Sequence, residues 1–277
     1  MSNSTNDIIR RRHIKLGDVE LELWEGGQGR PVFYLHGGHG FDPTAPFVNQ
    51  LCKRFRLIAP SHPGFGGSSL PLWMDSIDDF AHLYLELIQK IRLENIILVG
   101  SSIGGWIAAE MATKSTQHLA SMILVAPVGI KVGPRDRLDV PDIFAMSQEK
   151  LNKLLYRHPA LGVINSDSKS DKELETIARN RETLALVAWE PYMHNPKLKH
   201  RLHCIHCPTL FLRGDSDGLV SKDYVLAFAE LVPGASVDIV SEAGHAPQRE
   251  NPNEFVRKVA EFAEASSVDN SVSGEEP

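Results

Sequence analysis

The chain has few cysteines, no long apolar run and no excess of positive charge. Its 277 residues include three cysteines, an odd number that suits a reducing compartment. No apolar run is long enough to cross a bilayer, and the polar stretch 1–6 leads into arginines instead of a hydrophobic signal region. The net charge of -6 disfavours nucleic acid and acidic membrane surfaces as partners. We therefore expect a cytoplasmic protein; the sequence leaves its oligomeric state open, a homodimer included.

One short segment, Cys204-Ile205-His206-Cys207, brings metal-ligating residue types close together. A structural zinc site needs four ligands, and no second cluster with suitable spacing accompanies this one. The segment also leads into an apolar run and does not open a helix. The sequence therefore predicts the entry to a buried strand here, and it gives no indication of a metal or an organic cofactor.

Short apolar runs alternate with amphipathic stretches along most of the chain. Continuous apolar strands separated by helices are typical of a mainly parallel sheet with both faces covered, so the predicted fold class is α/β. Helical spacing is clear over 77–91 and again from about 253 to 263. The expected strands are 19–24, 31–35, 56–60, 96–99, 119–126, 208–213 and 236–240.

The alternation stops between residues 128 and 203, where helical patterns follow a charged stretch and no buried strand interrupts them. This segment predicts a helical cap inserted between two strands of the sheet. Residues 1–127 and 204–265 would then form the core. Residues 266–277 are polar and acidic and predict a disordered tail.

The most specific pattern is a serine between two glycines, Gly100-Ser101-Ser102-Ile103-Gly104, directly after an apolar run and before a helical stretch. Between a strand and a helix, G-x-S-x-G places the central serine on a sharp turn, and the glycines leave room for the backbone. The hydroxyl of Ser102 then projects above the strand, beside the free N–H groups of a helix N-terminus. The pattern predicts a nucleophile, although a serine that only caps a helix would have the same local sequence.

A serine nucleophile needs a base, and the base needs an acid that orients it. Two later loops contain these residue types: Gly214-Asp215-Ser216-Asp217 and Ala243-Gly244-His245, each directly after an expected strand. Loops at the carboxyl ends of parallel strands emerge at the same edge of a sheet. We therefore expect Ser102, an aspartate and His245 to converge there.

These motifs make the chain resemble the α/β-hydrolase superfamily from about Leu21 to Phe262. Each motif is weak alone, but five in the right order are specific, and the resemblance implies an α/β-hydrolase fold. The motifs are His36-Gly37-Gly38-His39-Gly40, Pro63-Gly64-Phe65-Gly66-Gly67-Ser68, the turn at Ser102, the aspartate loop and the histidine loop.

The resemblance gives each motif a role. Ser102 would be the nucleophile and His245 the base that takes its proton and later returns one to the leaving group. Asp217 would orient the imidazole, with Asp215 in the same loop as the rival acid. His36 would brace the glycine loop that follows it.

Backbone and pocket roles follow from the same resemblance. The N–H groups of Gly38 and Ile103 would form the oxyanion hole, where negative charge develops during acyl transfer. The pocket candidates are His39 in the glycine loop and Trp189 and Tyr192 in the cap.

Serine at the turn also indicates the reaction. Haloalkane dehalogenases and epoxide hydrolases of the superfamily have aspartate there, whereas serine implies an acyl-enzyme formed by attack on a carbonyl carbon. We therefore expect a carboxylesterase-like enzyme that cleaves an ester of a small molecule without a cofactor.

Three alternatives stay open. A carbon–carbon bond hydrolase of meta-cleavage products shares the cap, but it usually has asparagine before the nucleophile and tryptophan after the histidine, where this chain has Ser101 and Ala246. Such an enzyme could bind a substrate carboxylate through Arg179 or Arg181 of the cap. The His-Gly-Gly sequence also suits a proline iminopeptidase, and some members of the superfamily are receptors that retain the triad without turnover.

Overall fold

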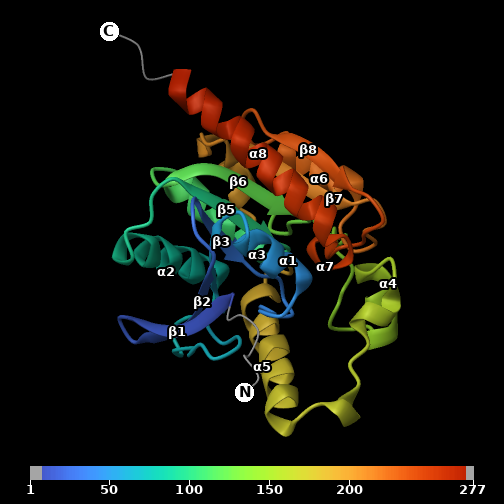
Figure 1. Ribbon diagram of the computed structural model, residues 1–277. Helices are drawn as coiled ribbons and strands as arrows, with labels where there is room; N and C mark the ends of the chain where they lie inside the picture. The colour runs from blue at the N-terminus through green and yellow to red at the C-terminus, as the bar shows by residue number, and fades with distance from the viewer. Residues whose placement is uncertain (1–7, 273–277) are drawn as a thin grey trace, which may run out of the picture.

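The computed structural model describes residues 8–272, which form one eight-stranded sheet with helices on both faces (Figure 1). The strand order is β1-β2-β4-β3-β5-β6-β7-β8. β2 (Val19–Gly26) is antiparallel to β1 (Ile9–Leu16) and to β4, and all other neighbours are parallel. The remaining strands are β3 (Pro31–Leu35), β4 (Arg56–Pro60), β5 (Ile96–Ser101), β6 (Leu119–Val125), β7 (Thr209–Gly214) and β8 (Ser236–Val240). The α/β prediction is confirmed.

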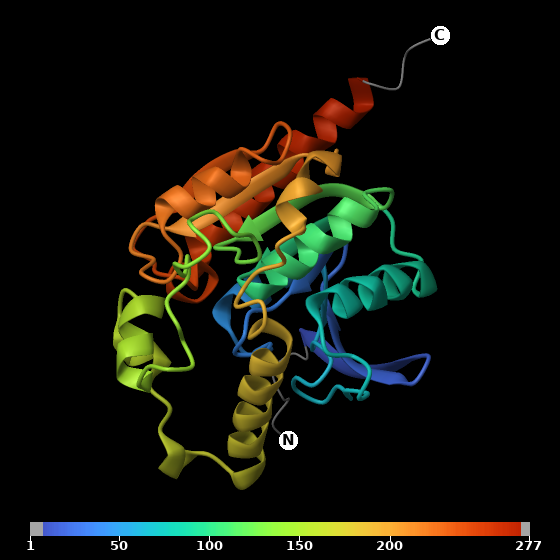
Figure 2. The ribbon, with the colours of Figure 1, turned by 180° about the vertical axis from the view of Figure 1, so that it is seen from behind.

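The sheet separates two hydrophobic cores, because successive side chains of a strand point to opposite faces. In β3, Phe33 and Leu35 pack on one face, whereas Val32 and Tyr34 pack on the other. The first face is covered by α2 (Ile77–Lys90), α3 (Ile103–Lys114) and α6 (Lys222–Ala229), and the second by α1 (Pro46–Cys52) and α8 (Pro252–Val272), as Figures 1 and 2 show from the two sides. The central strands are therefore apolar at almost every position.

Two elements differ from the sequence expectation. β1 was not expected, because its run of exposed arginines does not show the alternation of apolar and polar residues that is typical of a strand. In the structure, Arg11 and Arg12 form ion pairs with Glu22 and Glu25 of β2. Helix α8 also continues to Val272, past the predicted end near residue 263. No glycine or proline interrupts this segment before residue 273, so helical hydrogen bonding can continue.

The predicted disordered tail therefore differs from the structure over residues 266–272, which are helical. At the start of this stretch, the Ser266 hydroxyl donates a hydrogen bond to the carbonyl oxygen of Phe262, one helical turn earlier. The remainder of the predicted tail, 273–277, lies outside the described residues.

The segment between β6 and β7, residues 126–208, contains helices and no strand of the sheet. Its two longest helices, α4 (Gln148–Leu155) and α5 (Asp171–Ala188), lie beyond the carboxyl edge of the central strands (Figure 1). Its division from the core as a separate domain at residues 128 and 203 stays a prediction. The shorter elements of the segment are η1 (Pro159–Gly162), η2 (Ser166–Ser168), η3 (Leu198–His200) and η4 (Leu202–Cys204).

Buried side chains of α5 attach this inserted segment to the core. Asn180 accepts a hydrogen bond from the N–H of Gly66 at 3.1 Å and donates one to the carbonyl oxygen of His39, also at 3.1 Å. One turn later, Thr183 donates to the carbonyl oxygen of Gly64. Because unpaired buried polar groups are costly, these bonds fix α5 over two core loops.

The end of α4 attaches to the other two loops of the same sheet edge. The carbonyl oxygen of Leu154 accepts from the N–H of Gly218 at 3.0 Å, and that of Leu155 accepts from the N–H of His245 at 2.7 Å. The inserted segment is thus hydrogen-bonded to every loop that carries a predicted site residue, including the turn at Ser102, whose carbonyl oxygen accepts from the N–H of Val128 at 3.4 Å.

A pair of buried histidines joins the loops after β3 and β4. His36 accepts the N–H of His62 at its Nε2, and His62 donates from its own Nε2 to the carbonyl oxygen of His36. The hydroxyl of Tyr84 donates to Nδ1 of His62 at 2.6 Å. Both rings therefore fit these partners in the neutral form, and burial lowers the pKa of His36 to about 4 and that of His62 well below its ordinary value. The predicted bracing role of His36 agrees with these contacts.

From the burial of these two histidines we predict how the free energy of unfolding depends on pH. Between the ordinary pKa of 6.5 and the folded pKa of about 4 for His36, the unfolded chain binds more protons than the folded protein. The free energy of unfolding should therefore fall as the pH is lowered through this range. His36→Asn should reduce the slope by up to about 1.4 kcal/mol per pH unit, measured by urea denaturation from pH 7.5 to 4.

His13→Asn is the matched control for this experiment, because His13 is exposed on β1. Its stability profile should follow that of the wild-type protein. A His36→Asn profile parallel to the wild-type profile would show that the histidine pair does not couple folding to protons.

Candidate active site

Ser102 lies on a strained turn between β5 and α3. Its backbone angles are φ 55° and ψ -115°, a conformation that costs about 1–3 kcal/mol for a residue with a side chain. A Cβ atom at Gly104 would lie 2.2 Å from the carbonyl oxygen of Leu35, and one at Gly100 would lie 2.3 Å from that of Gly104. The two glycines of the motif are therefore required by close backbone packing, which holds the serine in its turn.

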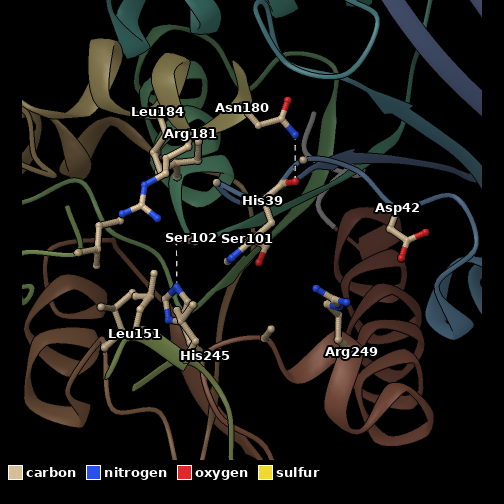
Figure 3. A pocket seen from close by; sticks show the side chains of 18 of the residues that line it. His39, Asp42, Ser101, Ser102, Leu151, Asn180, Arg181, Leu184, His245 and Arg249 are labelled. Carbon is tan, nitrogen blue, oxygen red and sulfur yellow. Dashed lines mark hydrogen bonds between the residues drawn. The ribbon is translucent and has the colours of Figure 1, made fainter. Parts of the chain in front are cut away.

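Ser102, His245 and Asp217 form a continuous hydrogen-bonded chain. Nε2 of His245 lies 3.0 Å from the Ser102 hydroxyl oxygen, and Nδ1 lies 3.0 Å from Oδ2 of Asp217 (Figure 3 draws the serine–histidine bond). The carboxylate fixes the proton on Nδ1, which leaves Nε2 free to accept the serine proton. The structure thus brings together residues from the loops after β5, β7 and β8, as the sequence predicted.

The loop of Asp217 is itself held rigidly. Oδ1 of Asp217 accepts the N–H groups of Leu219 and Val220 at 2.8 and 3.0 Å, and the whole side chain is inaccessible to solvent. Buried Arg213 donates hydrogen bonds to the carbonyl oxygens of Asp217 and Val220. The carboxylate therefore has a fixed orientation toward the imidazole.

Asp215, the rival acid, is directed elsewhere. Its carboxylate accepts from the hydroxyl of Ser216 and from the N–H groups of Glu242 and Ala243, and Arg157 lies 3.8 Å away. Slight burial acts to raise its pKa, but these hydrogen bonds and the positive charge outweigh it and lower the pKa. Asp215 thus stabilises the histidine loop from outside and does not contact the imidazole.

The backbone candidates Gly38 and Ile103 both line a cavity next to Ser102. Ile103 is the first residue of α3, where N–H groups have no acceptor within the helix. A side chain at Gly38 would collide with Leu184 of α5, because its Cβ atom would lie 2.6 Å from Cδ2 of that leucine. The glycine loop, the start of α3 and the inserted segment therefore meet at this point.

The cavity has a volume of about 360 Å³ and lies between the core loops and the inserted segment. His39 lines it, as predicted, and so do Leu155 and Met193. Trp189 and Tyr192 do not line it, so their assignment to this pocket was wrong. Their rings pack against Phe144, which lines the cavity in their place.

The charged groups of the cavity are mostly cationic. Its lining includes Lys169, Arg181 and Arg249, and Asp42 is the acidic residue among the lining residues. His39 is accessible from the cavity, yet loss of hydration lowers its pKa, and the charges of Arg249, His245 and Arg181 add to this effect. The imidazole of His39 is therefore neutral at physiological pH.

Sequence reasoning missed several polar residues of the cavity, among them Gln248, Arg249 and Asn180. Gln248 donates to the hydroxyl of Ser101 at 3.2 Å, and the hydroxyl of Tyr34 interacts with both residues. Arg249 follows directly, and Asn180 joins from α5. Gln248 and Arg249 lie three and four residues after His245, and this proximity in sequence was the signal that could have identified them.

The cysteine segment shows no arrangement for a metal. Cys204 is exposed, and Cys207 is buried two residues before β7, where burial raises the pKa of its thiol to about 11. Within residues 8–272, no three His, Cys, Asp or Glu side chains are grouped to hold a metal ion. The same part of the chain contains no helix that is long and apolar enough to span a bilayer.

The fold and this site define a hydrolase class, and comparison with known proteins supports the same class. Residues 32–258 match the model of the alpha/beta hydrolase family. The chain therefore belongs to the α/β-hydrolase family.

Known members resemble the chain over nearly its full length. It is 23% identical to the 2-hydroxy-6-oxo-2,4-heptadienoate hydrolase of Pseudomonas putida over 276 residues, which cover 96% of this chain and 99% of that protein. It is 26% identical to Lipase 1 of Psychrobacter immobilis over 264 residues, 90% of this chain and 81% of the lipase. The solved structure of a thermophilic esterase from Thermogutta terrifontis shares the fold, with a TM-score of 0.73, 24% identity and coverage of 93% and 99%.

The two aspartates of one loop provide a matched test of this geometry. Asp217→Asn should lower the rate of hydrolysis by about 10⁴-fold, because an amide in this position favours the wrong imidazole tautomer. Asp215→Asn should lower it by less than about tenfold, since this side chain only supports the histidine loop. Steady-state kinetics on one activated ester would compare them, and the reverse ranking would contradict the hydrogen-bond pattern.

Proposed function

We propose that the chain is a serine hydrolase that cleaves a carboxylic ester of a small molecule through an acyl-enzyme on Ser102. The observation that carries the proposal is the hydrogen-bonded chain from Ser102 through His245 to buried Asp217, with both distances at 3.0 Å. An imidazole so placed can take the serine proton as the oxygen attacks a carbonyl carbon.

The reaction would proceed in two halves. In the first, Ser102 attacks the ester carbonyl, His245 takes the hydroxyl proton at Nε2 and then donates it to the departing alcohol, and the acyl group remains on the serine oxygen. In the second, a water molecule attacks the acyl carbon while His245 takes one of its protons. Return of that proton to the serine oxygen releases the carboxylic acid and restores the enzyme.

Negative charge on the carbonyl oxygen would be stabilised by the N–H groups of Gly38 and Ile103. Ile103 adds the favourable field at the start of α3. The bonds of Asn180 to the glycine loop and to Gly66 would keep these donors in place before the substrate arrives. Preorganised donors need no rearrangement during the reaction, which is the main source of their effect.

The size and lining of the cavity support a small substrate. A volume of about 360 Å³ lies within the range of sites for small molecules, and apolar side chains from both the core and the inserted segment surround it. The similarity to a lipase and to an esterase fits ester cleavage.

A second candidate is hydrolysis of a carbon–carbon bond in a dienoate. It is favoured by the relative from Pseudomonas putida and by Arg181, which lines the cavity and could bind a substrate carboxylate. Arg179, the other arginine considered for this role, does not line it. Ser101 and Ala246 occupy positions where such hydrolases usually have asparagine and tryptophan, and this difference favours the ester.

A panel of p-nitrophenyl esters with increasing acyl length tests the proposal. The wild-type protein should show repeated turnover with an optimum at short or medium chains. Ser102→Ala should lower kcat by on the order of 10⁴-fold or more, because no other group can form the acyl-enzyme. Ser115→Ala, at the opposite end of α3, is the matched control and should retain wild-type rates.

The same assay separates the two candidates. If folded wild-type protein turns over dienoate diketone acids but none of the esters, the carbon–carbon reaction replaces the ester proposal. Ester turnover that persists in Ser102→Ala would remove the nucleophile assignment altogether.

A further inference from the structure

Two arginines of the cavity lie on different sides of Ser102. In Figure 3, Arg181 of α5 lies on one side, and Arg249 lies on the other, on the same side as Asp42. Arg249 comes from the short helix α7 (Pro247–Glu250), four residues after His245. The two guanidinium groups therefore serve separate parts of the cavity.

The contacts of Arg249 involve neutral groups. Its NH1 donates to the hydroxyl of Tyr156 at 3.3 Å, and its guanidinium carbon lies 5.9 Å from the centre of the Tyr156 ring. Tyr156 is itself buried and lies at the end of α4. These contacts orient the side chain but leave most of its five N–H donors free for another partner.

No carboxylate of residues 8–272 forms an ion pair with Arg249 within 4.0 Å. Asp42, the acidic residue of the lining, accepts hydrogen bonds from the N–H and the hydroxyl of Thr44. By contrast, Lys169 in the same lining is paired with Glu173 at 3.5 Å. Arg249 thus contributes a positive charge without an acidic partner to the cavity that also contains Ser102.

The electrostatic effect of Arg249 reaches the centre of the site. Its charge is the largest of the charge effects that lower the pKa of His39, after loss of hydration. The protein carries a formal net charge of -6, so a cationic cavity is not a consequence of its overall composition. Like charges in a cleft focus the field and favour ligands of the opposite sign.

We propose that Arg249 is a binding residue for a carboxylate of the substrate, so that the natural substrate is a small ester that also carries a free carboxylate group. This inference rests on the proposed function, because the ester is taken as the bond that the enzyme cleaves. A guanidinium group can donate two parallel hydrogen bonds to a planar carboxylate. One arginine is therefore enough to balance the single negative charge of that carboxylate. The carboxylate would hold the substrate so that its ester group lies at Ser102.

Calorimetric binding to the Ser102→Ala protein tests this without turnover. The anionic probes are monomethyl adipate, with the carboxylate on the acyl part, and 4-acetoxybutanoate, with the carboxylate on the alcohol part. Their neutral methyl esters are the matched controls. At least one anionic probe should bind about 10- to 100-fold more tightly than its neutral counterpart, and the preference should weaken as salt is added.

Substitutions then assign the preference to one residue. Arg249→Met or Arg249→Gln, each in the Ser102→Ala background, should abolish the preference, and Arg249→Lys should retain part of it. Arg179→Met removes the same charge from an exposed position of α5 outside the cavity, and it should leave the preference unchanged. Two different substitutions at position 249 are used so that, if one variant fails to fold, the other still tests the role of Arg249.

Three results would overturn the inference: equal binding of the neutral and anionic probes, a preference that survives both Arg249 substitutions, or a preference that only Arg181→Met removes. Failure of the ester proposal is a separate outcome. It would be seen as absence of ester turnover by the wild-type protein, whereas the binding preference is measured without any reaction.

Discussion

Ser102 has a backbone conformation that a free peptide avoids, and the packing of three elements forces the residue into it. Gly100 and Gly104 allow β5, α3 and the end of β3 to approach so closely that no side chain would fit between them. The strained turn lifts the hydroxyl above the sheet edge and places it at the N-terminus of α3. All other groups of the site are positioned relative to this one turn.

The loops around Ser102 are held by hydrogen bonds to one another and to the insertion, in addition to the bonds within each loop. His36 and His62 join two loops below the site, Asn180 joins two from above, and the end of α4 holds the loops of Asp217 and His245. Backbone groups make many of these bonds, so their geometry depends on the fold and not on a single side chain. These bonds hold the loops so that each nitrogen of the His245 ring lies 3.0 Å from its partner, Ser102 or Asp217.

The two aspartates of one loop show how surroundings divide the roles of identical side chains. Asp217 is turned inward, accepts two N–H groups and contacts the imidazole, whereas Asp215 is turned outward to Arg157 and the backbone of the next loop. The cavity shows a similar division of charge. Its arginines create a positive region within a protein of negative net charge, and such a region favours ligands of negative charge.

The sequence by itself determined the α/β fold, the turn at Ser102 and the convergence of that serine with His245 and an aspartate of the loop after β7. Each of these depends on local patterns: apolar strands, glycines at a tight turn, and loops that must leave a parallel sheet at one edge. Tertiary structure decided the rest. The edge strand β1 is formed by pairing with β2, and the cavity lining by the packing of α4 and α5. For this reason Trp189 and Tyr192, chosen by residue type, do not line the cavity, whereas Asn180 of α5 does. Side-chain direction in an irregular helical segment depends on contacts between residues distant in sequence, and no local pattern encodes those contacts.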